Sequence, residues 1–299
     1  MKDVVKTDLY QEVTNQIIEL IEAGNLKFEN GWANCLPYNA TTGTAYNGVN
    51  ILILLGIATV KGYEKGAWLT FKQAQAAGGS VKKGSKGTKI FYFDSIKVKD
   101  KETGEEKTIP MLKCFTVFNV AQCENLNPEK LMIKRSEQTN KTITDIQEIE
   151  EIAASFGVEI AHCESLESPC YFPSKDVIRM PKREQFKTTA NYYATLLHEL
   201  VHSTGHEKRL NREFSKRFGK EAYAFEELIA ELGAAFLCAE FGLIGATVEN
   251  HAAYLQSWLK VLKNDKKAIF TAASQAKKAA ELIRQCAAEN AELTQRKAA

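Results

Sequence analysis

The stretch LLHELVHSTGH, residues 196–206, constrains the fold and chemistry of this chain more than any other part of its sequence. It contains three of the five histidines, each four residues from the next. Successive residues of a helix are turned by about 100°, so His198 and His202 project from one face about 40° apart. Two imidazoles so placed can hold one metal ion, with Glu199 beside them as a general base. The stretch therefore predicts a metal site on a helix.

The residues before this HExxH motif favour a helix. The segment TTANYYATLL, residues 188–197, supplies a threonine at which a helix can begin and apolar residues on one helical face. The alternative is an exposed helix whose histidines pair with Glu199 or Glu207. The helical context favours the metal site.

The third metal ligand has three candidates. A catalytic zinc ion takes three protein ligands and keeps a fourth position open for water. His206 is the nearest candidate, but Gly205 is suited to end the helix, and His206 then need not remain on the face of His198. The other two candidates are Glu227 and Glu231, both in a second helical segment.

That second segment is FEELIAELGAAF, residues 225–236. Glu227 and Glu231 are four residues apart and share a helix face, whereas Glu226 points about 100° away. One of the pair can bind the metal while the other orients a histidine by accepting its ring N–H. Zn²⁺ is the expected ion, and another divalent metal would suit the same donors.

The composition predicts a globular, two-domain protein. The chain has 299 residues, of which 44% are hydrophobic and 25% charged, enough for two domains of ordinary size. Its most apolar stretch, residues 49–60, is too short to cross a membrane, and the N-terminus carries acids where a signal peptide needs an apolar core. Seven scattered cysteines without a CxxC pair fit reduced thiols. We therefore expect a cytoplasmic protein with no membrane partner.

The sequence becomes polar and loses its periodicity between residues 124 and 141. The first half predicts a helix ending at Gly24, a buried helix within residues 41–55, a short helix ending at Gly78, and a strand at 88–93 in a hairpin that turns near Thr103 and Gly104. The second half predicts a helix at 144–156, strands at 157–161 and 174–180, and four helical segments, the last at 266–297. We therefore expect an α+β fold with a first domain at 1–130, a linker at 131–142, and a mainly helical domain with a small sheet at 143–299.

Positive charge and aromatic residues gather in the first half. Residues 61–99 contain nine lysines against Glu64 and Asp94, an excess of seven. Lysines of a flexible loop can follow the phosphates of single-stranded nucleic acid while nearby rings stack on unpaired bases. No base-reading motif accompanies them, so such binding would be largely independent of sequence. The alternative is an ordinary solvated loop whose neighbouring rings, such as Phe91 and Phe93, face a core.

Both halves resemble one protein family. The segments TTGTAYNGVNILIL, WLTFKQAQAAGGSVKKGSKGTKI and FTVFNVAQCENL resemble the N-terminal module of the ArdC antirestriction proteins. HELVHSTGHEKRLNR and FEELIAELGAAFL are similar to the metallopeptidase domain joined to that module, and the resemblance covers about residues 9–262. The family implies carriage on plasmids or integrative elements, binding of single-stranded DNA, and protection of incoming conjugated DNA from host restriction.

The segment ELIAELGAAF also resembles the glutamate helix of the gluzincin metallopeptidases. There a glutamate ligand is followed four residues later by an acid that buttresses a histidine. The resemblance implies a zincin-like fold of gluzincin type, with Glu227 as the ligand and Glu231 as the buttress, although thermolysin-like enzymes have Asp at the second position. It also implies that the strand within residues 171–186 binds substrate at a sheet edge. Three tyrosines are candidates to donate a hydrogen bond to the oxyanion of the reaction: Tyr192, Tyr193 and Tyr223.

The leading hypothesis is an antirestriction protein that binds single-stranded DNA and cleaves a protein, such as a restriction subunit or a protein crosslinked to DNA. The alternatives are a DNA-binding shield with an idle peptidase fold, and a peptidase that cleaves a repressor. Two DNA-binding candidates come from the family motif, Tyr46 and Asn47, which can equally be turn and helix-cap residues. The others come from the basic, aromatic region: Trp68, Lys72, Lys82, Lys83, Lys86 and Lys89.

Overall fold

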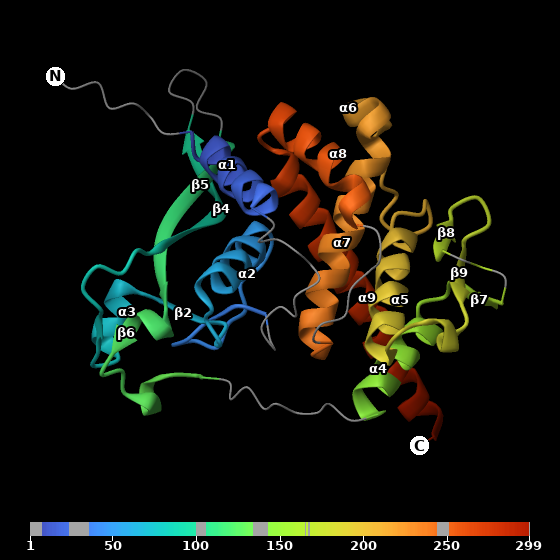
Figure 1. The fold of residues 1–299 in the computed structure, drawn as a ribbon, viewed down its shortest axis with the longest axis horizontal. Helices are drawn as coiled ribbons and strands as arrows, with labels where there is room; N and C mark the ends of the chain where they lie inside the picture. Colours follow the sequence, from blue (N-terminus) through green and yellow to red (C-terminus); the bar gives the residue numbers. More distant parts are fainter. Residues whose placement is uncertain are drawn as a thin grey trace. The chain divides into compact units, whose positions relative to one another are not determined.

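The computed structural model describes residues 8–23, 36–99, 106–133, 143–164, 166, 168–243 and 251–298. Its fold is α+β, as the sequence predicts (Figure 1). The chain divides into two compact units, one within residues 1–17 and 37–135 and the other within residues 18–36 and 136–299. Several expected features lie outside the described residues: Gly24, the hairpin turn at Thr103 and Gly104, and most of the linker, residues 134–142.

The first unit is built on a four-stranded sheet in the order β1-β2-β5-β4. β4 and β5 form a long antiparallel hairpin, β2 pairs antiparallel with β5, and β1 pairs parallel with β2. Two short strands, β3 and β6, form a separate antiparallel pair. The predicted strand at 88–93 is therefore the first half of a longer one. The strands are β1 (Tyr38–Asn39), β2 (Ala67–Thr70), β3 (Ser80–Val81), β4 (Thr88–Lys99), β5 (Glu106–Asn119) and β6 (Cys123–Glu124).

Helix α2 (Val49–Lys61) fills the core of the first unit. Its sequence is apolar on all sides, and residues 49–56 are buried, as expected of a helix enclosed by a domain. It ends at Gly62, whose φ of 65° is the left-handed conformation that glycine adopts most easily. Leu54 packs in one cluster with Ile90 of the sheet.

Asn50 fixes helix α2 to the outer strand of this sheet. Because β4 lies at the sheet edge, the backbone groups of Phe91 that point away from β5 have no strand partner. The Asn50 side chain binds both, donating to the Phe91 carbonyl at 2.7 Å and accepting from the Phe91 N–H at 2.8 Å. Asn50 is 2% exposed. This asparagine of the family motif is therefore a structural residue.

Two further helices belong to this part of the chain, α1 (Leu9–Glu22) and α3 (Phe71–Ala76). From Ile18 onward, α1 belongs to the second unit. α3 begins with a capping box, in which Thr70 and Gln73 each bind the other's backbone N–H.

The second unit contains a three-stranded sheet in the order β7-β9-β8. Its strands are β7 (Glu159–Cys163), β8 (Cys170–Phe172) and β9 (Val177–Pro181), with β7 parallel and β8 antiparallel to β9. β7 and β9 correspond to the two predicted strands. The expectation that the strand at 174–180 binds substrate at a sheet edge is wrong, because β9 is the central strand. The edge strands are β7 and β8, and β8, which the sequence did not reveal, is the one beside the pocket described below.

Six helices of the described residues complete this unit, and α7 packs against both α5 and α9 (Figure 1). They are α4 (Ile143–Ser155), α5 (Thr189–Ser203), α6 (Ser215–Phe218), α7 (Ala222–Phe241), α8 (His251–Asn264) and α9 (Ala268–Ala298). The predicted helices at 144–156 and 266–297 agree closely with α4 and α9. Within the part of the chain that the structure describes, none of the helices has the length and apolar character needed to cross a membrane.

Candidate metal centre

Helix α5 carries the HExxH motif and begins where the sequence predicts. Thr188 is its N-cap, and the threonine hydroxyl accepts a hydrogen bond of 3.1 Å from the backbone N–H three residues on. α7 lies close against α5 because residue 233 is glycine: a Cβ there would stand 2.8 Å from the methyl groups of Val201. This close approach brings Glu227 of α7 against the histidines of α5.

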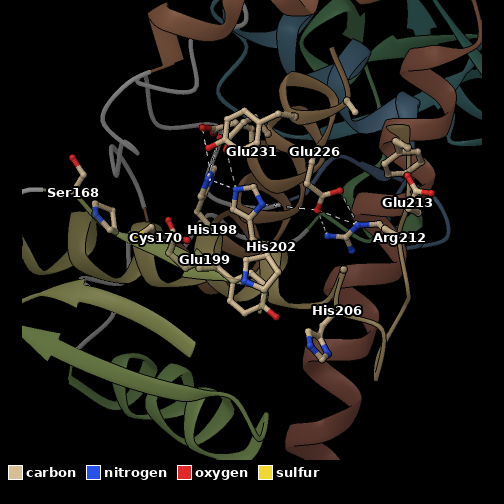
Figure 2. Close-up of a pocket in the computed structure, with 18 residues that line it drawn as sticks. Ser168, Cys170, His198, Glu199, His202, His206, Arg212, Glu213, Glu226 and Glu231 are labelled. Carbon is tan, nitrogen blue, oxygen red and sulfur yellow. Dashed lines mark hydrogen bonds and ion pairs between the residues drawn. The ribbon is translucent and has the colours of Figure 1, made fainter. Parts of the chain in front are cut away.

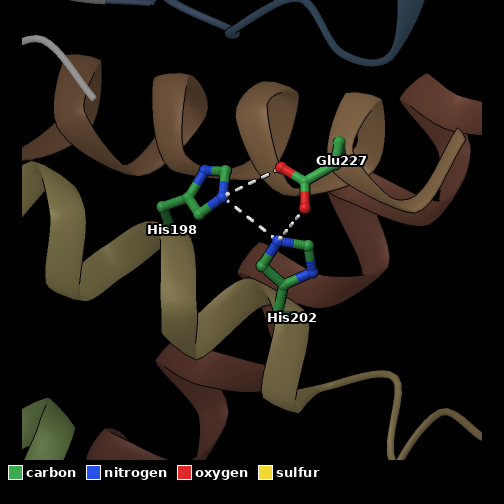
Figure 3. A group of neighbouring side chains, drawn as sticks. All are labelled: His198, His202 and Glu227. Atoms are coloured by element: carbon green, nitrogen blue, oxygen red, sulfur yellow. Dashed lines mark hydrogen bonds and ion pairs between the residues drawn. The ribbon is translucent and has the colours of Figure 1, made fainter. Parts of the chain in front are cut away.

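His198, His202 and Glu227 form a compact set of metal-ligand atoms (Figure 3). The Nε2 atoms of the two histidines are 3.1 Å apart. The Glu227 carboxylate places Oε2 3.6 Å from Nε2 of His198 and Oε1 3.4 Å from Nε2 of His202. His198 and Glu227 are buried. Two imidazole nitrogens and a carboxylate are donors that suit a divalent metal such as zinc.

Each histidine faces a second carboxylate with its other ring nitrogen. Nδ1 of His198 is 3.6 Å from Oε1 of Glu231, and Nδ1 of His202 is 3.9 Å from Oε1 of Glu226. A carboxylate at Nδ1 favours the tautomer whose Nε2 lone pair is free for a metal. Sequence reasoning expected one such acid and set Glu226 aside because of its angle on the helix. The structure places Glu226 beside the second histidine.

Arg212 holds Glu226 in position. Its guanidinium forms an ion pair with Glu226, with Nε 3.1 Å from each carboxylate oxygen, and also donates to the Val201 carbonyl at 2.9 Å and to the Thr204 hydroxyl. The Arg212 side chain is almost fully buried. Gly205 leaves room for it, because a Cβ at that position would lie 3.0 Å from Nη2 of Arg212. The glycine after the motif therefore admits an arginine and does not act as a left-handed helix cap.

Glu199 lies in the same pocket as the metal-ligand atoms (Figure 2). The pocket has a volume of about 650 Å³, and one wall is the segment Ser168–Tyr171, which leads into strand β8. Burial raises the pKa of the Glu199 carboxyl, while His198 and His202 partly offset that rise. A carboxyl with a raised pKa is suited both to accept and to return a proton.

The candidate metal ligands change one another's pKa. Burial alone would lower the pKa of His202, but Glu226 and Glu227 raise it to about 10. Burial alone would raise the pKa of Glu227, but the contacts with His198 and His202 bring it far below its usual range. His202 and Glu227 thus stabilise each other's charged forms, and a metal that binds Nε2 of His202 would displace a proton.

His206 does not join His198 and His202. Helix α5 ends at Ser203, and Nδ1 of His206 lies 4.0 Å from Oδ2 of Asp176, at another part of the pocket wall (Figure 2). The prediction that His206 leaves the helix face is therefore consistent with the geometry.

The three candidate tyrosines occupy different environments. Tyr192 and Tyr193 are buried. The Tyr192 hydroxyl contacts Nε2 of His162 at 2.8 Å, and the Tyr193 hydroxyl donates to the Glu150 carboxylate at 2.6 Å. Tyr223 is 64% exposed and lines the pocket. Of the three, Tyr223 is the one that lines the pocket, so it stays the candidate to donate a hydrogen bond to the oxyanion.

The aromatic DNA-binding candidates of the first unit lie in its core. Trp68 is 0% and Tyr46 is 5% exposed, and both pack in the cluster that contains Leu54. A ring enclosed on all sides cannot stack on a base, so the expected stacking role of Trp68 is wrong. Tyr92, one of the rings that the sequence places around the lysine loop, is exposed, and so is Phe115, which the sequence did not single out.

The polar candidates lie at the surface of the first unit. Lys89 is paired with Glu12, and Nζ of Lys82 donates to the Ala121 carbonyl at 3.0 Å. The remaining candidates are exposed: Asn47, Lys72, Lys83 and Lys86. They stay predictions as DNA contacts.

The HExxH helix and the second helix that carries Glu227 and Glu231 have the arrangement of a zincin. Comparison of the chain with family models agrees. Residues 147–275 match the model of the zincin-like metallopeptidases, and residues 7–118 match that of the N-terminal domain of the anti-restriction factor ArdC. The second unit is therefore a domain with a zincin-like fold.

Whole-chain comparisons identify the family. A metal-free crystal structure of the antirestriction ArdC protein from plasmid R388 is 41% identical, covers 95% of this chain and 99% of its own, and superposes with a TM-score of 0.81. The Mn(II)-bound structure of that protein is 40% identical over 94% and 99% of the two chains, with a TM-score of 0.77. The chain belongs to the ArdC antirestriction family.

Two further relatives come from bacteria. An uncharacterized protein of Sinorhizobium fredii, y4eC, is 38% identical over 92% of this chain and 91% of its own length. The DNA primase TraC of Escherichia coli is 37% identical over 93% of this chain but only 27% of its own length. This chain thus corresponds to about a quarter of that primase.

Proposed function

We propose that the second unit binds one divalent metal, with zinc as the first candidate, through His198, His202 and Glu227, and that it hydrolyses peptide bonds. The observation that carries this proposal is the convergence of both Nε2 atoms on the Glu227 carboxylate. The Mn(II)-bound structure of the R388 relative supports a divalent ion. Glu231 and Glu226 would hold the two histidines in the tautomer that binds the metal.

In this proposal the metal, when bound, supplies a Lewis acid that polarises the peptide carbonyl. Glu199 accepts a proton from the attacking water and returns it to the leaving amine, since its buried carboxyl has a raised pKa. Strand β8 is an edge strand beside the pocket. Its outer backbone edge would form hydrogen bonds with the main chain of an extended substrate. Tyr223, which lines the pocket, would donate a hydrogen bond to the oxyanion.

We further propose that the first unit binds single-stranded DNA with little sequence preference, and that the protein protects incoming conjugated DNA from restriction in the cytoplasm of its host. Membership of the ArdC family supports this role. So do the exposed lysines of the loop before β4, because cations there can follow a phosphate backbone. The relationship to the TraC primase adds a link to proteins that act on DNA.

The substitution Glu199→Gln tests the peptidase role without removing a metal ligand. The variant should bind metal and single-stranded DNA as the wild type does and should lose peptide hydrolysis, measured on a library of unfolded protein substrates. Peptide hydrolysis at the wild-type rate by this variant would refute the assignment of Glu199. Plasmid transfer into a restricting host then separates the two roles: lost protection assigns it to the peptidase, and full protection assigns it to DNA binding.

A further inference from the structure

An exposed aromatic pair lies on the β4–β5 hairpin of the first unit. Tyr92 of β4 is 40% exposed, and Phe115 of β5 is 44% exposed. Their ring centroids are 5.6 Å apart, and the ring planes meet at 79°, which is an edge-to-face contact. The two rings therefore form one continuous aromatic surface.

The pair continues the buried face of the sheet. Phe115 is directly opposite Ile90 in the hairpin, and Tyr92 is two residues beyond Ile90, so all three side chains point to one face. Ile90 and Val117 belong to the core cluster beneath α2. An apolar surface that is continuous with the core but exposed to solvent often marks a binding site.

Positive charge accompanies the two rings. Lys113 is directly opposite Tyr92 and so projects from the same face. The loop that precedes β4 carries exposed lysines at positions 82, 83 and 86. From Thr88, where the strand begins, to Tyr92 the distance along β4 is about 13 Å. A polyanion that also carries flat apolar groups matches this combination of charge and rings.

We propose that Tyr92 and Phe115 stack on unpaired bases of single-stranded DNA and that Lys113 contacts a neighbouring phosphate. This inference rests on the proposed DNA binding and gives it a location. A duplex keeps the faces of its bases inside the helical stack, so this surface favours single strands. Every base has a π-face, so the surface discriminates weakly between sequences.

The test compares two oligonucleotides of equal length, one of thymidines and one of abasic residues, by fluorescence anisotropy with the full-length protein. The wild type should bind the thymidine strand more tightly than the abasic strand and than a duplex. In the double variant Tyr92→Leu with Phe115→Leu, the side chains remain apolar but the rings are gone. Thymidine binding should weaken by about 5- to 150-fold for each stacked base lost, and abasic binding should not change.

Two matched controls accompany this variant. Tyr92→Phe keeps a ring and should bind thymidine as the wild type does. Val60→Ala changes another exposed apolar residue of the same unit, on α2 and 44% exposed, and should have no effect. Lys113→Gln should leave the ratio of thymidine to abasic binding unchanged but should reduce the slope of log affinity against log salt by about 0.7.

Equal thymidine binding by the double leucine variant and the wild type would overturn the stacking proposal and leave DNA binding itself intact. A wild type that binds no single-stranded DNA would instead refute the proposed function. If the double variant has a smaller solution mass but unchanged DNA binding, the face joins copies of the chain and the proposal is overturned. If the double variant loses abasic binding as well, the single variants Tyr92→Leu and Phe115→Leu are compared by their ratio of thymidine to abasic affinity. A ratio below that of the wild type supports stacking, and an unchanged ratio overturns it.

Discussion

At the scale of single residues, the proposed metal centre has carboxylates facing both ring nitrogens of each histidine. The Nε2 atoms face Glu227, while the Nδ1 atoms face Glu231 and Glu226. Such outer carboxylates set the orientation and basicity of a histidine ligand. Arg212 in turn holds Glu226. We therefore expect Glu226, which binds no metal in our proposal, to contribute to metal affinity.

Glu226→Gln should therefore weaken metal binding by about 10- to 100-fold, because the amide keeps the size of the carboxylate but not its charge. Calorimetric titration of the purified variant with Zn²⁺ measures this. Glu213→Gln is the control, since Glu213 lines the same pocket, and it should bind metal as the wild type does. Unchanged affinity in Glu226→Gln would mean that Glu226 does not support His202.

Some of these residues could be predicted from sequence and others could not. The spacing of His198 and His202 fixes their common face, because the helix period is fixed. Glu226 was missed because its role depends on Arg212, which lies outside the helix and reaches it only in the folded chain. Trp68 was predicted to be exposed for stacking but is buried. Composition shows how many rings a region contains, but it does not show which of them the folded chain buries.

At the scale of secondary structure, single side chains hold the elements together in both units. Asn50 joins α2 to the edge strand β4 through both backbone groups of Phe91. A buried backbone group without a partner costs about 1 to 3 kcal/mol. Asn50→Leu leaves two such groups and should destabilise the first unit by about 2 kcal/mol or more.

Hydrogen–deuterium exchange of peptides from β4 measures this loss. Exchange at residues 88–99 should be faster in Asn50→Leu than in the wild type. Asn47→Leu replaces a nearby exposed asparagine and should leave the exchange of β4 unchanged. Equal protection of β4 in Asn50→Leu would show that the side chain does not secure the strand.

In the second unit, Asp176 joins the turn between β8 and β9 to the end of α5. Asp176 accepts a hydrogen bond of 2.8 Å from the Tyr171 hydroxyl and forms an ion pair with Arg209, whose Nε donates to the Ser203 carbonyl at 2.7 Å. Asp176 has a φ of 52°, a conformation that Asn and Asp tolerate better than most residues. Burial alone would raise the pKa of Asp176, but Arg209 and Tyr171 lower it below its usual value.

A lowered pKa in the folded state means that Asp176 stabilises the fold fully above its unfolded pKa of about 3.9. That contribution is lost as the pH falls through the lower, folded pKa. Asp176→Asn should therefore lower the urea midpoint of unfolding at pH 7, and the difference from wild type should shrink as the pH falls below 4. Glu184→Gln removes an exposed carboxylate of the same unit and should shift the midpoint little. A difference that does not depend on pH would contradict the ion-pair account.

The elements themselves were predicted to different degrees. The helices at α4, α5 and α9 follow from apolar periodicity over many residues. Strand β8 has only three residues, too few to show alternation, and its edge position depends on pairing with β9. That is why the strand next to the pocket was assigned to the wrong segment.

At the scale of the whole molecule, the two proposed activities belong to different units. The proposed metal ligands lie in the second unit, and the exposed aromatic pair lies in the first. Removal of metal by a chelator should therefore abolish peptide hydrolysis and change the affinity for single-stranded DNA by less than about twofold, as measured by anisotropy at constant ionic strength. A loss of DNA affinity that added Zn²⁺ restores would show that the units are coupled.

The central claim is that His198, His202 and Glu227 bind one divalent metal, with Glu231 outside the ligand set. The most direct test is equilibrium dialysis with Zn²⁺, read as metal per chain by elemental analysis, for the wild type, Glu227→Gln and Glu231→Gln. The wild type should bind one ion per chain at this site, Glu227→Gln should lose it, and Glu231→Gln should retain it with weaker affinity, by about 10- to 100-fold. Retention of the ion by Glu227→Gln together with its loss from Glu231→Gln would contradict the assignment.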